Sequence, residues 1–151
     1  MKRGLAIAVC TIMLMLGLTG CGERVAMTAD AFVQAVGELG YTAEKTDSVD
    51  GTETYVLAND EETSLSFVVS AGEKEALVYE LFDNTVSSFE EAHTTVTMSL
   101  SASASNWEYY HATGGEEFLI LCRVDNTLLC SVSTPEHAKE LKGLFEELGY
   151  K

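Results

Sequence analysis

The chain has 151 residues, of which 46% are hydrophobic, and it carries 24 acidic against 9 basic side chains, a formal net charge of −15. This charge argues against binding to nucleic acid or to anionic lipid headgroups, because both would repel such a surface. The length and the hydrophobic content suffice for one domain with a real core.

The first 20 residues have the pattern of an export signal. Lys2 and Arg3 form a short positive segment, and residues 4–17 follow without a charge. This uncharged stretch is shorter than the roughly 20 apolar residues that span a bilayer, so it predicts a signal peptide rather than a membrane helix. Residues 18–21, Leu-Thr-Gly-Cys, resemble the lipobox of bacterial lipoproteins.

The lipobox resemblance implies the chemistry of Cys21. Its thiol would carry diacylglycerol through a thioether, and cleavage before it would make Cys21 the first mature residue. Two acyl chains hold a protein stably on a membrane, whereas one holds it marginally. We therefore expect a palmitate-type lipid anchor on the extracytoplasmic face of the cell membrane. The alternative is an uncleaved signal anchor, or a secretory signal followed by an unmodified cysteine.

This interpretation divides the chain into a signal peptide at 1–20, a lipidated tether at 21–27 and a single domain at 28–151. Lys2 and Arg3 leave with the signal peptide, so 131 residues remain, with 7 basic and 24 acidic side chains and a net charge of −17. The lipid would hold this acidic domain at the membrane against its own electrostatics.

The first part of the domain reads as a helix followed by strands. Thr28 is a suitable N-cap, Phe32, Val36 and Leu39 form an apolar helix face, and Gly40 ends the helix. The alternation of apolar and polar residues and the turn residues between them predict four strands, at 41–46, 53–58, 65–69 and 76–82, with a hairpin turn at Asp50-Gly51.

The segment after residue 83 has two interpretations. Val86, Phe89 and His93 fall on one side of a helix that Asp83-Asn84 would cap, and we favour a helix to about residue 99. The β-branched run at 94–97 and the period-two alternation over 96–102 favour a strand instead. A Ser/Ala-rich loop is expected at 101–106.

The last third predicts strands at 107–112, 117–124 and 127–133, and then a helix that begins near Pro135 and Glu136. The order is helix, four strands, helix, three strands, helix. Because no strand–helix–strand unit repeats, we expect an α+β fold with an antiparallel sheet and helices packed on one face. The repeated Glu-Leu-Gly-Tyr at 38–41 and 147–150 indicates either two duplicated halves or two independent helix C-caps.

Several of these segments together resemble a family of short lipoproteins from Gram-positive bacteria that has no assigned activity. The matching stretches are the first helix and its end, from residues 28–32 to residues 39–41, the segments 79–83 and 123–128, and the final helix to residues 147–150. Each is a packing or turn motif. The resemblance therefore implies the fold and the membrane location, and it carries over no catalytic residue.

Cys122 and Cys130 are a candidate disulfide, because Cys10 would leave with the signal, Cys21 would be alkylated, and an exported compartment permits disulfides. If Asp125-Asn126 is a two-residue turn, Cys122 pairs with Leu129 and the two thiols point to opposite faces of the sheet. If the loop has three residues, Cys122 pairs directly with Cys130 and both thiols lie on the same face. Turn chemistry favours the first arrangement and apolar patterning the second. Without a bond, both would be buried thiols that act as small hydrophobic groups.

Trp107 and Tyr109 are a candidate binding surface. Alternation along a strand places them on one face of the sheet and Tyr110 on the other. Exposed, the pair would bind a glycan or a peptide; packed under a helix, it would belong to the core.

We expect no catalytic residue, metal site or cofactor. His93, His111 and His137 lack metal-ligand spacing, and the acidic stretch at 47–53 lacks the EF-hand spacing. The motifs of nucleophilic catalysis and phosphate binding are absent. The sequence therefore predicts a membrane-tethered, non-enzymatic binding or accessory module for an envelope component. The alternatives are a small-ligand or metal-binding lipoprotein and, last, an envelope hydrolase.

Overall fold

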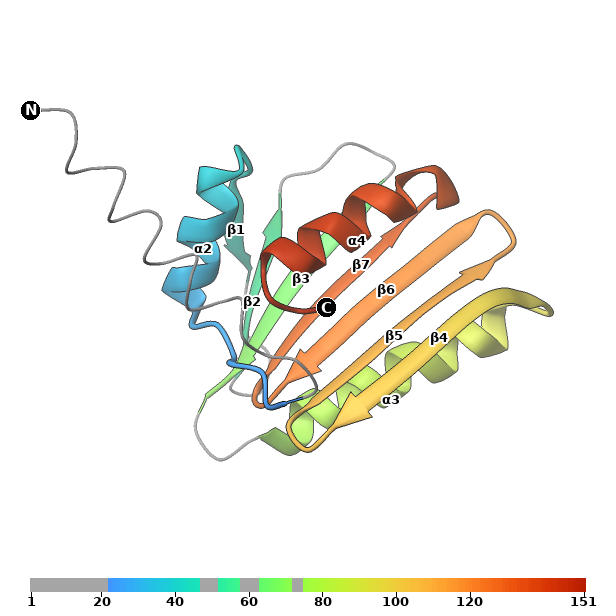
Figure 1. The fold of residues 1–151 in the computed structure, drawn as a ribbon, viewed down its shortest axis with the longest axis horizontal. Coiled ribbons are helices and arrows are strands. Elements are labelled where there is room, and N and C mark those ends of the chain that lie inside the picture. Colours follow the sequence, from blue (N-terminus) through green and yellow to red (C-terminus); the bar gives the residue numbers. More distant parts are fainter. Residues whose placement is uncertain (1–21, 47–51, 58–62, 72–74) are drawn as a thin grey trace, which may run out of the picture.

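The computed structural model describes residues 22–46, 52–57, 63–71 and 75–151. The described strands form one antiparallel sheet in the order β1-β2-β3-β7-β6-β5-β4 (Figure 1). The elements along the chain are α2 (Ala29–Glu38), β1 (Ala43–Thr46), β2 (Thr52–Leu57), β3 (Thr63–Ser70), α3 (Glu75–Ala92), β4 (Val96–Ala104), β5 (Trp107–Gly114), β6 (Glu117–Val124), β7 (Thr127–Ser133), a 3₁₀ turn at Pro135–His137 and α4 (Ala138–Glu147).

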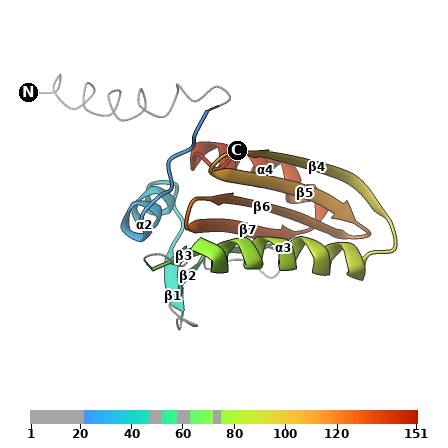
Figure 2. The same ribbon diagram turned by 90° about the horizontal axis from the view of Figure 1, so that it is seen from below.

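The α+β class and the antiparallel sheet are confirmed, but the expectation that all helices pack on one face is wrong. Figure 2 shows α3 on the face of the sheet opposite α4. The core is accordingly divided into two clusters, one around Phe67, Phe145 and Tyr150 beneath α2 and α4, and another around Phe82 and Leu121 beneath α3. Both faces of the sheet are apolar, so both need a helical cover.

Residues 76–82 were predicted to form a strand and instead begin α3. Val78, Phe82 and Phe89 are the buried residues of this helix, at a helical spacing of four and seven. The short apolar run at 76–82 fits both a strand and a helix, and the continuation of the apolar face to Phe89 favours the helix. The second helix thus begins and ends earlier than expected, and the element order becomes three strands, helix, four strands.

Residues 96–104 form β4, so the strand interpretation holds for this segment and the helix to residue 99 is wrong. The predicted loop at 101–106 is also wrong over most of its length, because β4 pairs with β5 up to the Ala104–Trp107 pair. His93 follows the end of α3: its Nδ1 lies 2.8 Å from the Phe89 carbonyl oxygen, and its ring packs so closely on Gly114 that a Cβ there would collide with it.

The ends of α2 and the C-terminal end of α4 agree with the predictions, whereas the predicted cap at Asp83-Asn84 lies inside α3. The Thr28 hydroxyl accepts a hydrogen bond from the Ala31 amide at 3.2 Å, which satisfies a free amide of the first turn of α2. Gly40 and Gly149 have φ values of 90° and 76°, and each places a tyrosine after a helix. In two duplicated halves, the repeated motif would occupy the same place in each half. Here the helix that ends at Gly40 comes before its strands and the helix that ends at Gly149 comes after its strands, so the repeated Glu-Leu-Gly-Tyr marks two independent C-caps.

Candidate functional site

The segment that follows Cys21, residues 22–27, packs against the domain, and we call it the N-terminal strap. The Trp107 indole donates a hydrogen bond to the Gly22 carbonyl oxygen at 3.2 Å. Asn106 binds the Arg24 backbone at both its amide (3.1 Å) and its carbonyl (2.6 Å), and the Met27 amide donates to the Tyr150 hydroxyl at 3.3 Å. The described part of the predicted tether is therefore not free chain.

Tyr109 is buried beneath α4, with 3% of its surface exposed, so the open aromatic surface proposed for Trp107 and Tyr109 is not present. Trp107 is half-buried, and the Arg24 guanidinium lies 3.7 Å from the centre of its ring. The predicted alternation holds, because Tyr110 packs in the α3-side cluster. The two aromatic side chains thus anchor the strap and fill the core instead of meeting a ligand.

Cys122 and Cys130 are free thiols on opposite faces of the sheet, which contradicts the candidate disulfide. Cys122 is paired with Leu129 and Val124 with Thr127, so Asp125-Asn126 is a two-residue turn. Asp125 adopts the left-handed backbone region, with φ at 47°, that Asp tolerates. Turn chemistry, rather than apolar patterning, decides the register.

Burial raises the pKa of both thiols to about 12, so neither forms a reactive thiolate near neutral pH. We expect native protein spanning residues 22–151 to resist a thiol reagent at pH 8. After denaturation both thiols should titrate, with or without prior reduction. A titre that rises after reduction would contradict the free-thiol assignment.

His111 is a buried histidine in contact with the core. Its Nδ1 lies 3.1 Å from the Tyr109 hydroxyl. Its pKa is lowered chiefly by burial, and Lys142 and Lys151 add to the effect. The folded state therefore holds this imidazole neutral at a pH where the unfolded chain protonates it.

This shift gives the protein a pH-dependent stability. Below about pH 6.5 the unfolded state binds more protons at His111 than the folded state, so the free energy of unfolding falls as the pH drops from 6.5 through the lowered pKa. We expect His111→Gln to reduce the difference between urea midpoints measured at pH 7.5 and pH 5.5. An unchanged difference would contradict the assignment.

The other candidate ligands are not brought together. In the part of the chain that the structure describes, no group of three or more His, Cys, Asp or Glu side chains is placed to hold a metal ion. Most of the acidic stretch at 47–53 lies outside the described residues. Its last member, Glu53, pairs with Lys45 at 2.6 Å and accepts a hydrogen bond from Tyr55 at 3.0 Å.

Arg123, on β6, is a buried cation. Its guanidinium lies 3.6 Å from the Tyr79 ring centre and 3.8 Å from the Glu108 carboxylate. Nε and Nη1 have no hydrogen-bond partner among the described residues. The side chain is 3% exposed, so a ligand in solution does not reach it in this conformation.

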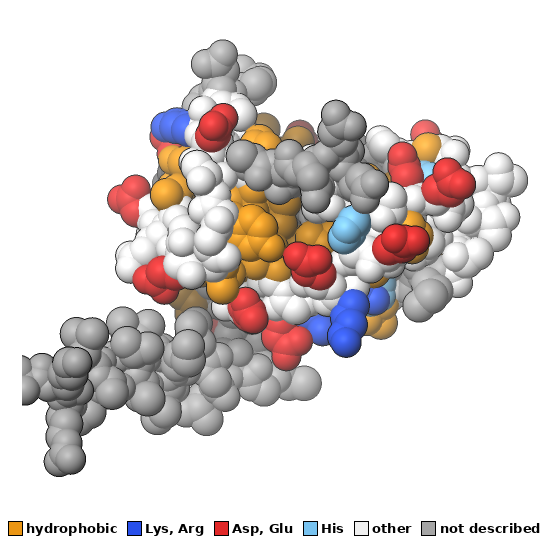
Figure 3. All heavy atoms as spheres, turned by 90° about the horizontal axis from the view of Figure 1, so that it is seen from above, with side chains coloured by type: hydrophobic (Ala, Val, Ile, Leu, Met, Phe, Trp, Pro, Cys, Tyr) orange, Lys and Arg blue, Asp and Glu red, His pale blue; other side chains and the backbone are white. Residues whose placement is uncertain are grey.

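A groove runs between α4 and the segment that joins α2 to β1. Its deepest part is a cavity of about 100 Å³, with an apolar floor of Leu57, Leu65, Leu141 and Leu144. This is below the roughly 300–1,000 Å³ of pockets that enclose drug-sized ligands, and it suits a single side chain. A wider, open part of about 510 Å³ continues along α4. Figure 3 shows the hydrophobic hollow with carboxylates beside it.

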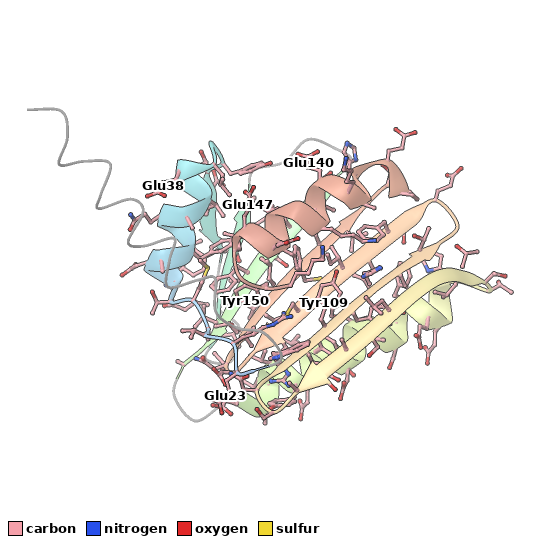
Figure 4. All side chains as sticks on the ribbon, in the orientation of Figure 1. Glu23, Glu38, Tyr109, Glu140, Glu147 and Tyr150 are labelled. Atoms are coloured by element: carbon pink, nitrogen blue, oxygen red, sulfur yellow. The ribbon has the colours of Figure 1, made fainter. Side chains whose placement is uncertain are left out.

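Carboxylates line the rim of this groove. Glu136, Glu140 and Glu147 come from one stripe of the 3₁₀ turn and α4, with Lys139 as the one basic side chain lining the open part among the described residues. Figure 4 shows Glu140 and Glu147 on α4. Tyr41 donates a hydrogen bond to Glu140 at 3.4 Å across the groove.

The groove and the strap lie at opposite ends of the sheet. The cavity is lined by Leu57 and Thr63, and the strand register places Thr63 beside Ser133. The strap contacts Trp107, which pairs with Val124 at the other end of the same strands. A side chain in the cavity would therefore not compete with the strap.

Sequence reasoning missed this groove. The one local signal is the run of carboxylates at 136, 140 and 147 beside Leu144, which lie along one side of a helix. The opposite wall, Leu39 and Tyr41, lies about a hundred residues earlier and meets α4 only in the folded chain.

The sequence and the structure were compared with those of known proteins. No family model matches the sequence, and no curated protein is significantly similar to it. A crystal structure of a GTP binding regulator from Thermotoga maritima is similar over 85% of this chain and 91% of that one, with 12% identity and a TM-score of 0.48. A likeness this distant says nothing of what the present chain binds. Among the described residues, no helix is long and apolar enough to cross a membrane.

Proposed function

We propose that this protein is a lipoprotein, anchored through Cys21 on the extracytoplasmic face of the cell membrane, whose domain is a non-enzymatic binding or accessory module. The groove between α4 and the segment that joins α2 to β1 would bind a cationic, amphipathic segment of another envelope protein. The observation that carries the proposal is the apolar floor of the groove beneath a rim of carboxylates.

The chemistry of the groove selects this kind of occupant. The floor offers leucine side chains to an apolar group, and a buried leucine or valine side chain contributes about 1.5–3 kcal/mol to binding before ordering costs. The rim carboxylates lie where they would meet Lys or Arg side chains on either side of that group. Net negative charge also steers a cationic partner toward the domain.

The anchor part of the proposal rests on the sequence of residues 1–21. The net charge of −17 that the mature chain would carry is compatible with it, because lipid would hold such a domain at an anionic surface. The small volume of the cavity gives the small-ligand alternative less support than the peptide-binding one.

A peptide titration tests the groove. The probe is a synthetic peptide in which two leucines are flanked by lysines, observed by NMR on residues 22–151. We expect shifts concentrated at Tyr41, Leu65 and Leu144, with binding that weakens as salt is added. The matched peptides replace lysine by glutamate or leucine by glycine, and both should bind several-fold less tightly.

Variants that neutralise carboxylates test whether the rim of the groove contributes to peptide binding. Glu140→Gln combined with Glu147→Gln should weaken binding of the lysine–leucine peptide by about tenfold, because each exposed charge pair contributes roughly 0.2–1 kcal/mol. Glu80→Gln, on the exposed side of α3, is the control and should leave it unchanged. Shifts that spread evenly over the surface, or equal loss in both variants, would contradict the groove as the binding site.

A further inference from the structure

The strand β4 forms one edge of the sheet, and its outer side has no partner strand among the described residues. It is nine residues long, and most of its described side chains are exposed, among them Leu100 (51% exposed), Ser101 and Ser103. The edge strand at the other side, β1, is four residues long and carries the Lys45–Glu53 ion pair beside it. Short, charged edges resist further pairing, whereas long uncharged ones invite it.

Within the domain at 28–151, the region around β4 is the longest stretch of sequence without an acidic or basic residue. Between Glu91 and Glu108 the sequence contains no Asp, Glu, Lys or Arg, although the whole chain carries 33 such residues, 24 acidic and 9 basic. It also contains no proline, so a neighbouring strand would find donors and acceptors along the whole edge.

We propose that β4 pairs with β4 of a second copy of this chain, which joins two sheets into one continuous antiparallel sheet. The distribution of charge favours a second copy of this chain as the partner of β4. Contacts between copies through other surfaces would work against the net charge of each chain, which is −15 for the full chain and −17 without residues 1–20. At β4 the same surface meets itself without a charge, as an interface with two-fold symmetry requires.

The side chains at the centre of β4 suit this pairing. The register with β5 places Leu100 and Ala102 opposite His111 and Tyr109, on the α4 side of the sheet, and Ser101 opposite Tyr110 on the α3 side. In an antiparallel pair centred on Ser101, Leu100 therefore lies opposite Ala102 of the second copy on one face, and the two Ser101 side chains meet on the other.

The paired arrangement is compatible with the rest of the molecule. A two-fold axis perpendicular to the sheet places both N-terminal straps on the same face of the joined sheet, because each strap contacts the α4-side face of its own β5. The groove lies toward the opposite edge of the sheet, near β1 to β3, and stays open. The proposal needs neither ligand binding in the groove nor lipid on Cys21.

Co-purification of two tagged copies tests the pairing. Full-length chains with two different C-terminal tags are expressed together. The protein is purified through one tag, and the chain that carries the other tag is then detected in the purified sample. We expect the unmodified copies to co-purify. Leu100→Lys with Ser101→Lys in both copies should reduce co-purification by about tenfold, because the lysines at 101 then oppose each other directly and those at 100 lie diagonally across the pair. Leu100→Glu with Ser101→Glu in both copies should do the same.

Co-expression of the two variants shows whether charge repulsion or misfolding causes the loss of co-purification. A lysine-bearing copy and a glutamate-bearing copy should co-purify again, which a folding defect would not permit. Glu44→Lys on β1 is the control and should leave co-purification unchanged. Failure of the unmodified copies to co-purify, no loss in the lysine variant, or no recovery in the mixture would overturn the proposal. So would a different protein retained in place of the second copy.

Discussion

Replacement of Cys21 by alanine is expected to abolish lipid attachment completely. In a bacterial host supplied with labelled palmitate, the unmodified full-length chain should incorporate label and the Cys21→Ala chain none. The physical reason is that the acyl chains attach through this one thiol, and a two-chain anchor contributes about 0.8 kcal/mol for each buried CH₂. The variant should also keep residues 1–20, because the lipobox ends at Cys21.

The matched control is Cys10→Ala, which changes the other cysteine of the first 21 residues and should incorporate label normally. Mass spectrometry of the labelled chain should find a diacylglyceryl group on Cys21 as the first residue. Equal labelling of the Cys21→Ala and unmodified chains, or a mature chain that begins elsewhere, would contradict the lipoprotein assignment.

Phe67→Ala should have the largest effect on stability. Phe67 is fully buried, stacks on Phe32 with ring centres 4.3 Å apart and meets the edge of Tyr150 at 5.9 Å. Its truncation would leave a cavity where β3 meets α2 and the C-terminal segment, at a cost of about 3–5 kcal/mol. This is a large share of the roughly 5–15 kcal/mol that stabilises a typical domain.

Urea unfolding of residues 22–151 measures this loss. The control is Leu81→Ala on α3, where the leucine is 39% exposed, and it should change the free energy of unfolding by less than about 0.5 kcal/mol. A Phe67→Ala loss no larger than that of the control would contradict the position of Phe67 at the centre of the core.

The sequence predicted the elements whose signals are local. The Thr28 cap, the Gly40 helix end and the strands at 117–124 and 127–133 depend on a few neighbouring residues, and the structure confirms them. At Asp125-Asn126 the sequence left a two-residue turn and a three-residue loop open, and the structure shows the two-residue turn that the local backbone preference favours.

Elements that depend on distant partners were predicted less well. Residues 76–82 and 93–102 have patterns that fit both a helix and a strand, and the sheet order decides between them. Because β7 occupies the place beside β3, the chain must cross beneath the sheet after β3 to start the second set of strands at the far edge. A helix, α3, makes this crossing and covers the second apolar face.

The candidate site shows the same division. The carboxylate stripe at 136, 140 and 147 can be read from the sequence, but its apolar floor combines β2, β3 and α4. For Trp107 and Tyr109 the alternation was correct, while their burial depended on the strap and the last helix.

The most direct test of the proposed binding role is photo-crosslinking in cells from a position inside the groove. A photoreactive amino acid replaces the exposed Gly143, which lines the open part of the groove, and the control position is Glu80 on α3. We predict that position 143 captures an envelope protein through a segment rich in lysine or arginine, and that Glu140→Gln with Glu147→Gln reduces the capture. No capture from position 143, or equal capture from position 80, would contradict a binding module that acts through this groove.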